Sequence, residues 1–326
     1  MKKKNIFPPV SVIIIMRNAS TTITSALGSL VKQNYPLKDI IVVDNASTDD
    51  SVKLVLDFAK KNKIQITLIK HEKNMGVSTS FNDGARKANA DLLVFMMSDG
   101  ILEKESEIEK LTFPLRENKK NVGSYASTLQ PEYVWNTYNY WQKYYSARSI
   151  NSANVMMTGH FDCVRKDVFD KIGGFDTTNF GEDAIGGEDA DFSLRLEKEG
   201  GVVRSKAEVI HLHYMGSNFS LKDILSSHKI YARAYGRLLR RFMFRFPKEL
   251  VSLLFKPILA VIPFIPSLHE FGIGLIVFYS FFYTRKMFLS ASTLMNPRII
   301  LIPLLNIILL YYDVFWIGQA FLTKRR

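Results

Sequence analysis

One short stretch, residues 91–100, constrains the fold of this chain more than any other. It reads Asp-Leu-Leu-Val-Phe-Met-Met-Ser-Asp-Gly, an apolar run that ends in one acidic residue and a glycine. Such a run is typical of a strand that is buried on both faces, as in parallel sheets. An acid placed directly after such a strand stands where α/β proteins bind their ligands. We therefore expect Asp99 to lie in a binding site at the end of a buried strand.

Three similar apolar runs come earlier in the chain, and amphipathic segments separate them. The runs cover residues 10–16, 40–43 and 64–69, and the segments between them place apolar side chains at helical spacing. Strands that alternate with helices through short turns predict right-handed crossovers. The sequence therefore predicts an α/β fold with a mostly parallel, Rossmann-like sheet.

Polar residues follow each of these predicted strands. They are Arg17 and Asn18, Asp44 and Asn45, residues 74–76, and Ser98 with Asp99. Because the carboxyl ends of parallel strands share one edge, we expect a polar site of nucleotide size there. Each residue also has a local explanation, for example Asp44 as a turn former and Asn74 as part of a helix entry.

The order of the motifs resembles that of the family 2 glycosyltransferases, which have the GT-A fold. The resemblance extends over residues 8–218, and the series of motifs in order is far more specific than any one of them. The motifs are Val-Ser-Val-Ile-Ile-Ile-Met-Arg-Asn (10–18), Ile-Val-Val-Asp-Asn-Ala-Ser-Thr-Asp (41–49), Asn-Met-Gly-Val-Ser-Thr-Ser-Phe-Asn-Asp-Gly (74–84), Phe-Met-Met-Ser-Asp (95–99), Lys-Ile-Gly-Gly-Phe-Asp (171–176) and Gly-Gly-Glu-Asp-Ala-Asp-Phe-Ser-Leu-Arg-Leu (186–196).

The resemblance implies a donor site for a nucleotide sugar. It implies that Asn18 and Asp44 contact the base and ribose, with Asn74 and Gly76 nearby. Arg17 departs from the family pattern, because a small or aromatic residue usually stands near the base pocket. The predicted donor-binding residues are Arg17, Asn18, Asp44, Asn74, Gly76, Ser98 and Asp99.

The resemblance also implies a divalent metal, Mg²⁺ or Mn²⁺, held against the donor diphosphate. Asp99 matches the second acid of the family's Asp-x-Asp motif, whereas Met97 stands where the first acid usually is. One carboxylate can still hold such an ion, which completes its shell with phosphate oxygens and water. We expect poor metal affinity without nucleotide. The alternative is that Met97 marks a weakened or metal-independent site.

Two histidines, His211 and His213, follow later in the chain within Glu-Val-Ile-His-Leu-His. On a strand their side chains share one face. The family usually carries one histidine here, which approaches the metal or the diphosphate, and His211 is our first choice. The alternative is a structural or solvent-facing pair.

A second group of acids supplies the candidate catalytic base. Glu188 and Asp189 stand at the start of a predicted helix, where the dipole favours ionised carboxylates. An ionised acid next to a sugar hydroxyl is what a general base requires. The resemblance places the base on Asp189 and implies an inverting single displacement. Asp191 is the second candidate, helix capping is the structural alternative, and we expect Asp183 to belong to a loop that closes over substrate.

The last third of the chain predicts membrane association. Residues 221–246 form an amphipathic pattern whose polar side is strongly basic, which is typical of a helix at a membrane surface. The apolar segment 251–283 is broken by prolines, while 299–322 is long enough to cross a hydrocarbon core and carries only Asp313 as a charge. We expect a kinked hairpin followed by a second membrane element. For the apolar segments the alternatives are re-entrant or interfacial helices, or a soluble core helix over 299–322. For the basic segment the alternative is a helix packed on the catalytic domain with its basic face in solvent.

The amino-acid composition limits the classes of binding partner that we expect. Lys and Arg exceed Asp and Glu by 43 to 31, and this excess favours anionic partners. The basic residues cluster beside the apolar tail, which favours lipid head groups and no nucleic acid. The single cysteine, Cys163, excludes an intramolecular disulfide and favours a reducing compartment.

The sequence therefore predicts a membrane-associated, inverting glycosyltransferase with its catalytic domain on the cytoplasmic side of the cell membrane. We expect the GT-A catalytic domain over residues 1–220, a basic amphipathic helix over 221–249 and a hydrophobic tail over 250–326. The expected partners are a nucleotide-sugar donor, a lipid-linked or cell-envelope glycan acceptor, and membrane lipids. Two alternatives are a polyprenyl-phosphate glycosyl synthase and a catalytically decayed membrane scaffold.

Overall fold

The protein divides into two compact units, here in a computed structural model that describes residues 7–149, 154, 156–180, 186–212, 218–243 and 248–323. Unit 1 comprises Met1–Gln130 and Ser152–Tyr214, and unit 2 comprises Pro131–Asn151 and Met215–Arg326. The aromatic segment 131–151, which we expected within the catalytic domain, thus groups with the C-terminal part of the chain. Each unit packs around hydrophobic clusters of its own.

Within the described residues, unit 1 holds a sheet of eight strands in the order β3-β2-β1-β4-β7-β6-β8-β5. Neighbours from β3 to β4 pair in parallel, as the sequence predicts, and β6 also pairs in parallel with β8. The pairs β4–β7, β6–β7 and β5–β8 are antiparallel, so the sheet is mixed. The strands are β1 (Val10–Met16), β2 (Leu37–Asp44), β3 (Thr67–Lys70), β4 (Leu92–Met97), β5 (Gly100–Ile101), β6 (Asn121–Leu129), β7 (Phe161–Arg165) and β8 (Gly201–His211).

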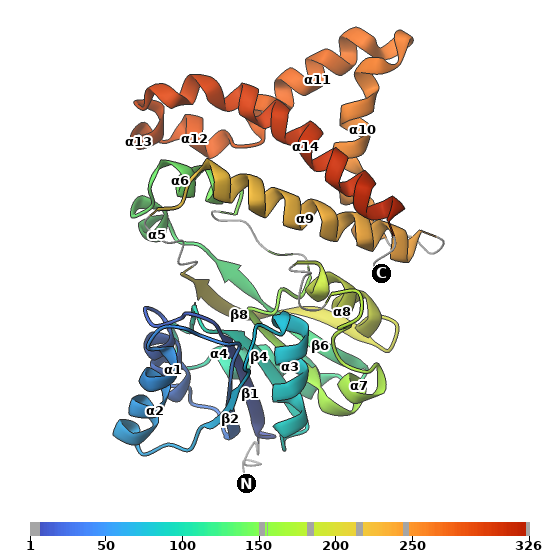
Figure 1. Ribbon diagram of the computed structural model, residues 1–326. Helices are drawn as coiled ribbons and strands as arrows, with labels where there is room; N and C mark the ends of the chain where they lie inside the picture. Colours follow the sequence, from blue (N-terminus) through green and yellow to red (C-terminus); the bar gives the residue numbers. More distant parts are fainter. Residues whose placement is uncertain are drawn as a thin grey trace. The chain divides into compact units, whose positions relative to one another are not determined.

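Helices cover both faces of this sheet (Figure 1). Because side chains alternate along a strand, Val12 and Ile14 of β1 pack in one cluster, while Ile13 and Ile15 pack in the other. Leucines of α1 and α4 complete the first cluster, and phenylalanines of α3, α7 and α8 complete the second. The helices are α1 (Ile23–Val31), α2 (Ser51–Asn62), α3 (Gly76–Lys87), α4 (Glu107–Glu117), α7 (Lys166–Lys171) and α8 (Glu188–Leu196).

Unit 2 is helical in its described part. Helix α9 runs alongside α14 (Figure 1), and Ala232 and Leu239 of α9 pack against Ile317 of α14. Much of the apolar side of the basic helix is therefore covered by protein, and its role at a membrane surface stays a prediction. The helices are α5 (Glu132–Asn136), α6 (Tyr140–Ser146), α9 (Leu221–Phe242), α10 (Phe255–Val261), α11 (His269–Phe282), α12 (Arg285–Leu289), α13 (Ala291–Leu294) and α14 (Ile302–Leu322), with 3₁₀ turns at Lys248–Leu254, Ile262–Phe264, Pro266–Leu268 and Pro297–Leu301.

Two apolar segments of unit 2 have the length and composition of membrane elements. Among the described residues, the helical stretch Pro297–Leu322 is long and apolar enough to cross a membrane. The segments Val251–Phe264 and Pro266–Phe282 pass the same test only as a pair, and they meet at a bend of 101°. This bend lies where the prolines predict a break, and it fits both the kinked hairpin and the alternative of a re-entrant segment. These features favour association with a membrane.

Close packing of α3 on the sheet gives a test of the fold. A Cβ added at Gly84 would overlap the side chain of Ile13, so α3 approaches β1 closely only because residue 84 is glycine. We expect Gly84→Val to destabilise the full-length protein by about 1–3 kcal/mol through overpacking. Gly28→Ala in α1 is the control, because nothing lies near its added Cβ. Thermal melting in detergent measures both, and equal melting temperatures for the two variants would contradict this packing.

Candidate active site

The loop after β2 is held between two of the predicted donor-binding residues, Asn18 and Asp44. Met16 and Asp44 are partners in the β1–β2 register, so the two strands end side by side. The Asp44 carboxylate is buried and accepts a hydrogen bond from Ser47 N at 3.2 Å. Asn18 Oδ1 accepts from Thr48 N at 2.8 Å. The structure therefore brings Asn18 and Asp44 to one loop.

Amides continue this polar edge from β2 to the start of α3. Asn45 Nδ2 donates to Asn74 Oδ1 at 2.6 Å, and Asn45 Oδ1 accepts from Met75 N at 2.7 Å. Gly76 adopts a φ of +81°, which favours glycine, and its N–H donates to Asn74 Oδ1 at 3.1 Å. Asn74 and Gly76 are therefore part of the same edge as Asp44. Arg17 lies exposed just beyond β1.

A histidine that our sequence reasoning missed, His71, also lies at this edge. Its Nδ1 lies 3.2 Å from Asn45 Oδ1, and its Nε2 lies 2.9 Å from Asp83 Oδ2. Burial lowers the pKa of His71, while the nearby Asp44 carboxylate opposes this effect. The sequence could have indicated His71 through its position just after the third predicted strand, at the edge where the other polar residues were expected.

The acid of the opening stretch, Asp99, meets the predicted histidine. Asp99 Oδ2 lies 2.9 Å from His211 Nε2, and both side chains are largely buried. The backbone fixes this meeting, because Leu212 N donates to Asp99 O at 3.0 Å and Gly100 pairs with His211 between β5 and β8. The ring of His160 packs on that of His211, with centroids 4.2 Å apart. His213 lies outside the described residues.

Asp99 and His211 are the two predicted metal ligands that the structure places in contact. Among the described residues, no group of three His, Cys, Asp or Glu side chains is close enough together to hold a metal ion. Met97 supplies no ligand, since its side chain packs on the second hydrophobic cluster. Ser98 is buried, and its N–H donates to Ile15 O at 3.2 Å. One carboxylate and one imidazole fit an ion that takes its remaining ligands from phosphate and water.

The candidate base, Asp189, stands in the first turn of α8 beside Glu188. Gly187, the residue before this helix, has a φ of +88°. Asp189 Oδ1 accepts from Ala190 N at 2.7 Å, and burial raises the pKa of Asp189 while this N–H opposes it. The second candidate, Asp191, is fully buried, and its Oδ2 accepts from Arg195 Nε at 2.8 Å. This ion pair gives Asp191 a structural role.

A further acid that sequence reasoning missed, Asp162, lies near Asp189. It is buried in β7 next to β4, and its Oδ2 accepts from Thr158 N at 3.0 Å and Gly159 N at 2.6 Å. Burial raises the pKa of Asp162 to about 7; the Asp189 carboxylate also raises it, and the two N–H donors oppose this shift. One acid within the apolar run Phe-Asp-Cys-Val was the signal in the sequence.

Stability should depend on pH through Asp162. Its pKa is about 7 when folded and 3.8 when unfolded, so its contribution to stability is full below pH 3.8 and is lost as pH rises through 7. Asp162→Asn keeps an acceptor oxygen without the charge. We expect the variant to gain in melting temperature over the wild type at pH 8 and to lose most of that gain at pH 5.

The control for this experiment is Asp170→Asn, which removes an exposed carboxylate of α7. Its melting temperature relative to the wild type should change little between pH 5 and pH 8. If the melting temperature of Asp162→Asn differed from that of the wild type by the same amount at pH 5 and pH 8, this result would contradict the raised pKa of Asp162.

Two family models match the sequence and together span both units. The model described as "Glycosyl transferase family 2" matches residues 11–173. The model described as "Glycosyl transferase family group 2" matches residues 117–317. The first covers half of the chain and includes the strand ends described above.

The chain is similar to curated proteins that are named as glycosyltransferases or glycan synthases. The chain is 25% identical over 248 residues to a dolichyl N-acetyl-α-D-glucosaminyl phosphate 3-β-D-2,3-diacetamido-2,3-dideoxy-β-D-glucuronosyltransferase of Methanococcus voltae, which covers 71% of this chain and 74% of that protein. It is 24% identical over 122 residues to a poly-β-1,6-N-acetyl-D-glucosamine synthase of Staphylococcus epidermidis, which covers 37% of this chain. The chain spans only 28% of the length of the staphylococcal synthase.

A solved structure has the same fold. The mannosyltransferase PcManGT from Pyrobaculum calidifontis, solved in complex with GDP-Man and Mn²⁺, superposes with a TM-score of 0.62 at 15% identity. The match covers 96% of this chain and 88% of the mannosyltransferase. At this identity the likeness establishes the GT-A fold, which confirms the predicted fold class.

Proposed function

Because the chain belongs to glycosyl transferase family 2 and is a glycosyltransferase of GT-A fold, we propose that it transfers a sugar, with inversion, from a nucleotide-sugar donor to a hydroxyl group. The proposed acceptor is a lipid-linked or cell-envelope glycan. The observation that carries the proposal is the contact of Asp99 with His211 at the sheet edge where Asp44 also lies. An acid–imidazole pair beside a polar edge is suited to a nucleoside diphosphate.

The proposed donor site lies along the ends of β1, β2 and β4. Asn18 and Asp44 hold the loop on which the base and ribose are proposed to rest, and Asn74 with Gly76 continues the same edge. Arg17 and Ser98 flank this edge after β1 and β4. The exposed guanidinium of Arg17 offers a charge to the phosphates, which favours donor binding.

A divalent ion, Mg²⁺ or Mn²⁺, is the proposed cofactor, and Asp99 and His211 would hold it. When bound, such an ion neutralises charge on the departing nucleoside diphosphate. The chain supplies few ligands of its own in its described part, so we expect weak binding of the ion without nucleotide.

Asp189 is the proposed general base. The acceptor hydroxyl loses its proton to the Asp189 carboxylate while its oxygen bonds to the anomeric carbon, and the bond from that carbon to the diphosphate breaks. The N-terminal end of the α8 dipole favours the ionised form of the Asp189 carboxylate. Burial raises the pKa of Asp189, which brings it closer to the working pH. Glu188, beside it, is proposed to contact the same substrate.

The lipid-linked acceptor and the location at the cell membrane rest on two observations. The name of the Methanococcus relative describes transfer to a sugar on dolichyl phosphate. In addition, the stretch Pro297–Leu322 is long and apolar enough to span a membrane. We place the catalytic unit on the cytoplasmic side.

Asp189→Asn tests the proposed mechanism. We expect this variant to lose transfer by about 10²–10⁴-fold, because general-base catalysis contributes this much. Binding of the nucleoside diphosphate should survive, since Asp189 is not part of the donor edge. The assay measures release of nucleoside diphosphate from a panel of nucleotide sugars by the membrane-embedded protein, with calorimetry for binding.

The matched control is Asp167→Asn. Asp167 also stands in the first turn of a helix, and its Oδ1 accepts from the next N–H at 2.9 Å, as Asp189 Oδ1 does at 2.7 Å. It should leave transfer unchanged. Normal turnover in Asp189→Asn would move the base to another residue, and transfer that survives only to a lipid monophosphate would favour a polyprenyl-phosphate glycosyl synthase.

A further inference from the structure

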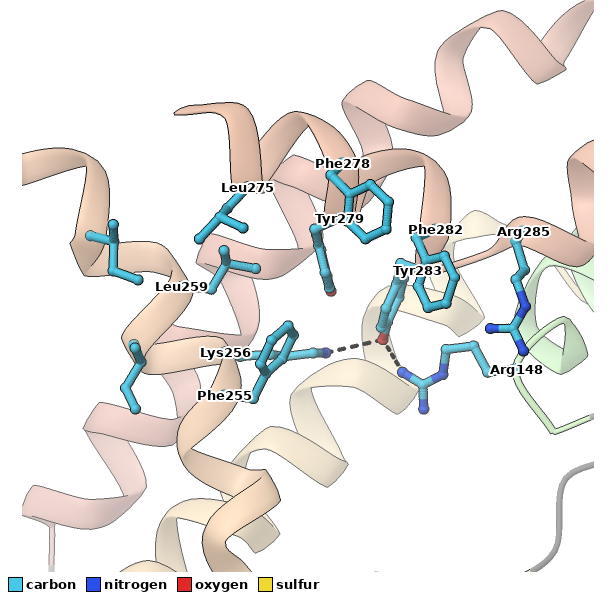
Figure 2. A pocket seen from close by; sticks show the side chains of 12 residues that line it. Arg148, Phe255, Lys256, Leu259, Leu275, Phe278, Tyr279, Phe282, Tyr283 and Arg285 are labelled. Carbon is cyan, nitrogen blue, oxygen red and sulfur yellow. Dashed lines mark hydrogen bonds between the residues drawn. The ribbon is translucent and has the colours of Figure 1, made fainter. Parts of the chain in front are cut away.

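Unit 2 contains a cavity that none of the proposed donor-binding, metal-binding or catalytic residues lines. It has a volume of about 530 Å³ and lies against α10 and α11, with Arg148 after α6 and Arg285 at the start of α12 completing its wall (Figure 2). This volume is in the range of small-molecule binding sites. All of its lining residues belong to unit 2 and are described.

One wall of the cavity is apolar and open to the surroundings. Phe255 and Ile258 of α10, and Phe278 and Phe282 of α11, line the cavity, although each is between 50% and 64% exposed. Exposed aromatic and aliphatic side chains gathered in one place mark a binding site for an apolar partner. They belong to the two segments that meet at the 101° bend. A hydrocarbon chain that enters through the open side would cover them.

The opposite end of the cavity is basic. Lys256 Nζ donates to Tyr283 Oη at 3.0 Å, and Arg148 also donates to this hydroxyl; Figure 2 draws both contacts. The guanidinium of Arg285 lies over the Phe282 ring, with its carbon 4.7 Å from the centroid. Three cations therefore gather around the end of α11, and no acid lines the cavity.

The charge at this end is only partly balanced by the protein. Asp313 of α14 forms an ion pair with Lys256, and it also accepts from His228 Nδ1 at 2.9 Å. Among the described residues, neither Arg148 nor Arg285 forms an ion pair with a carboxylate. Counting these groups, three cations against one carboxylate leave an excess of about two positive charges.

We propose that this cavity binds a lipid with a terminal phosphate monoester, whose phosphate lies among Arg148, Lys256 and Arg285 and whose chain lies along the apolar wall of α10 and α11. A phosphate monoester carries a charge of about −1.5 to −2 at neutral pH, which matches the excess. A diester phospholipid carries one negative charge and matches it less well. Arginine side chains suit phosphate because their planar guanidinium groups form paired hydrogen bonds with its oxygens.

The inference concerns binding and goes beyond the proposed transfer reaction. A lipid monophosphate held here is a candidate acceptor or a carrier of the acceptor. If transfer fails with every sugar donor, the lipid site still stands; if lipid binding fails, transfer to a soluble glycan is unaffected.

The test uses the full-length protein in phosphatidylcholine nanodiscs and a fluorescent polyprenyl monophosphate as the probe. We expect the monophosphate to bind at least tenfold more tightly than the matching polyprenyl alcohol or phosphatidylglycerol. Arg148→Gln and Arg285→Gln should each weaken binding several-fold, and together at least tenfold. Arg298→Gln is the control, because it removes the same charge from unit 2 at a residue that does not line the cavity.

Folding is checked by melting temperature, and binding of nucleoside diphosphate is checked in parallel, so that loss of lipid binding is not confused with unfolding. Asp189→Asn should bind the probe as the wild type does. Three results would overturn the inference: equal binding of the alcohol, equal binding of phosphatidylglycerol, or unchanged binding in the folded double arginine variant. If inorganic phosphate competed with the probe as strongly as unlabelled lipid does, the inference would also be overturned, because the hydrocarbon chain of the lipid would then contribute nothing to binding.

Discussion

The candidate site depends on one constraint, the burial of β4 in the middle of the sheet. Strand β4 lies between β1 and β7, so it is paired on both sides, and it ends at Met97. Asp99 is the second residue after the end of β4. The chain then pairs with β8 at Gly100, and this pairing places His211 against Asp99. The meeting of the acid and the imidazole is therefore a consequence of strand packing.

The same packing explains which parts could be predicted from sequence. Strand β1 has the predicted bounds, and β4 lies within the predicted apolar run, because such apolar runs are typical of strands that are buried on both faces. The polar edge that we propose as the donor site also follows from the sequence, since parallel strands end together. His71 and Asp162 could not be assigned in this way, because their partners are distant in sequence. His71 meets Asn45 across 26 positions, and Asp162 is influenced by Asp189 only in the folded protein.

The division into units shows a second limit of sequence reasoning. The aromatic segment 131–151 reads as part of the catalytic domain, yet Tyr144 donates to Asn306 of α14 at 2.6 Å, across 162 positions. Asn306 also donates to Thr284 Oγ1 at 2.9 Å. Polar groups within apolar segments are costly unless paired, and Asn306 and Asp313 are both paired within unit 2. Helical periodicity predicts the elements of this unit but not these contacts.

The central claim is that Asp99 and His211 bind a metal together with a nucleoside diphosphate. The most direct measurement is calorimetric binding of UDP and GDP as a function of Mn²⁺ concentration, for the wild type, Asp99→Asn and His211→Gln. We predict tight binding of one nucleotide only with Mn²⁺, and about 10–100-fold more Mn²⁺ needed by each variant. Binding that is equally tight in the presence of a chelator and unchanged in both variants would contradict the claim and favour the metal-independent site suggested by Met97.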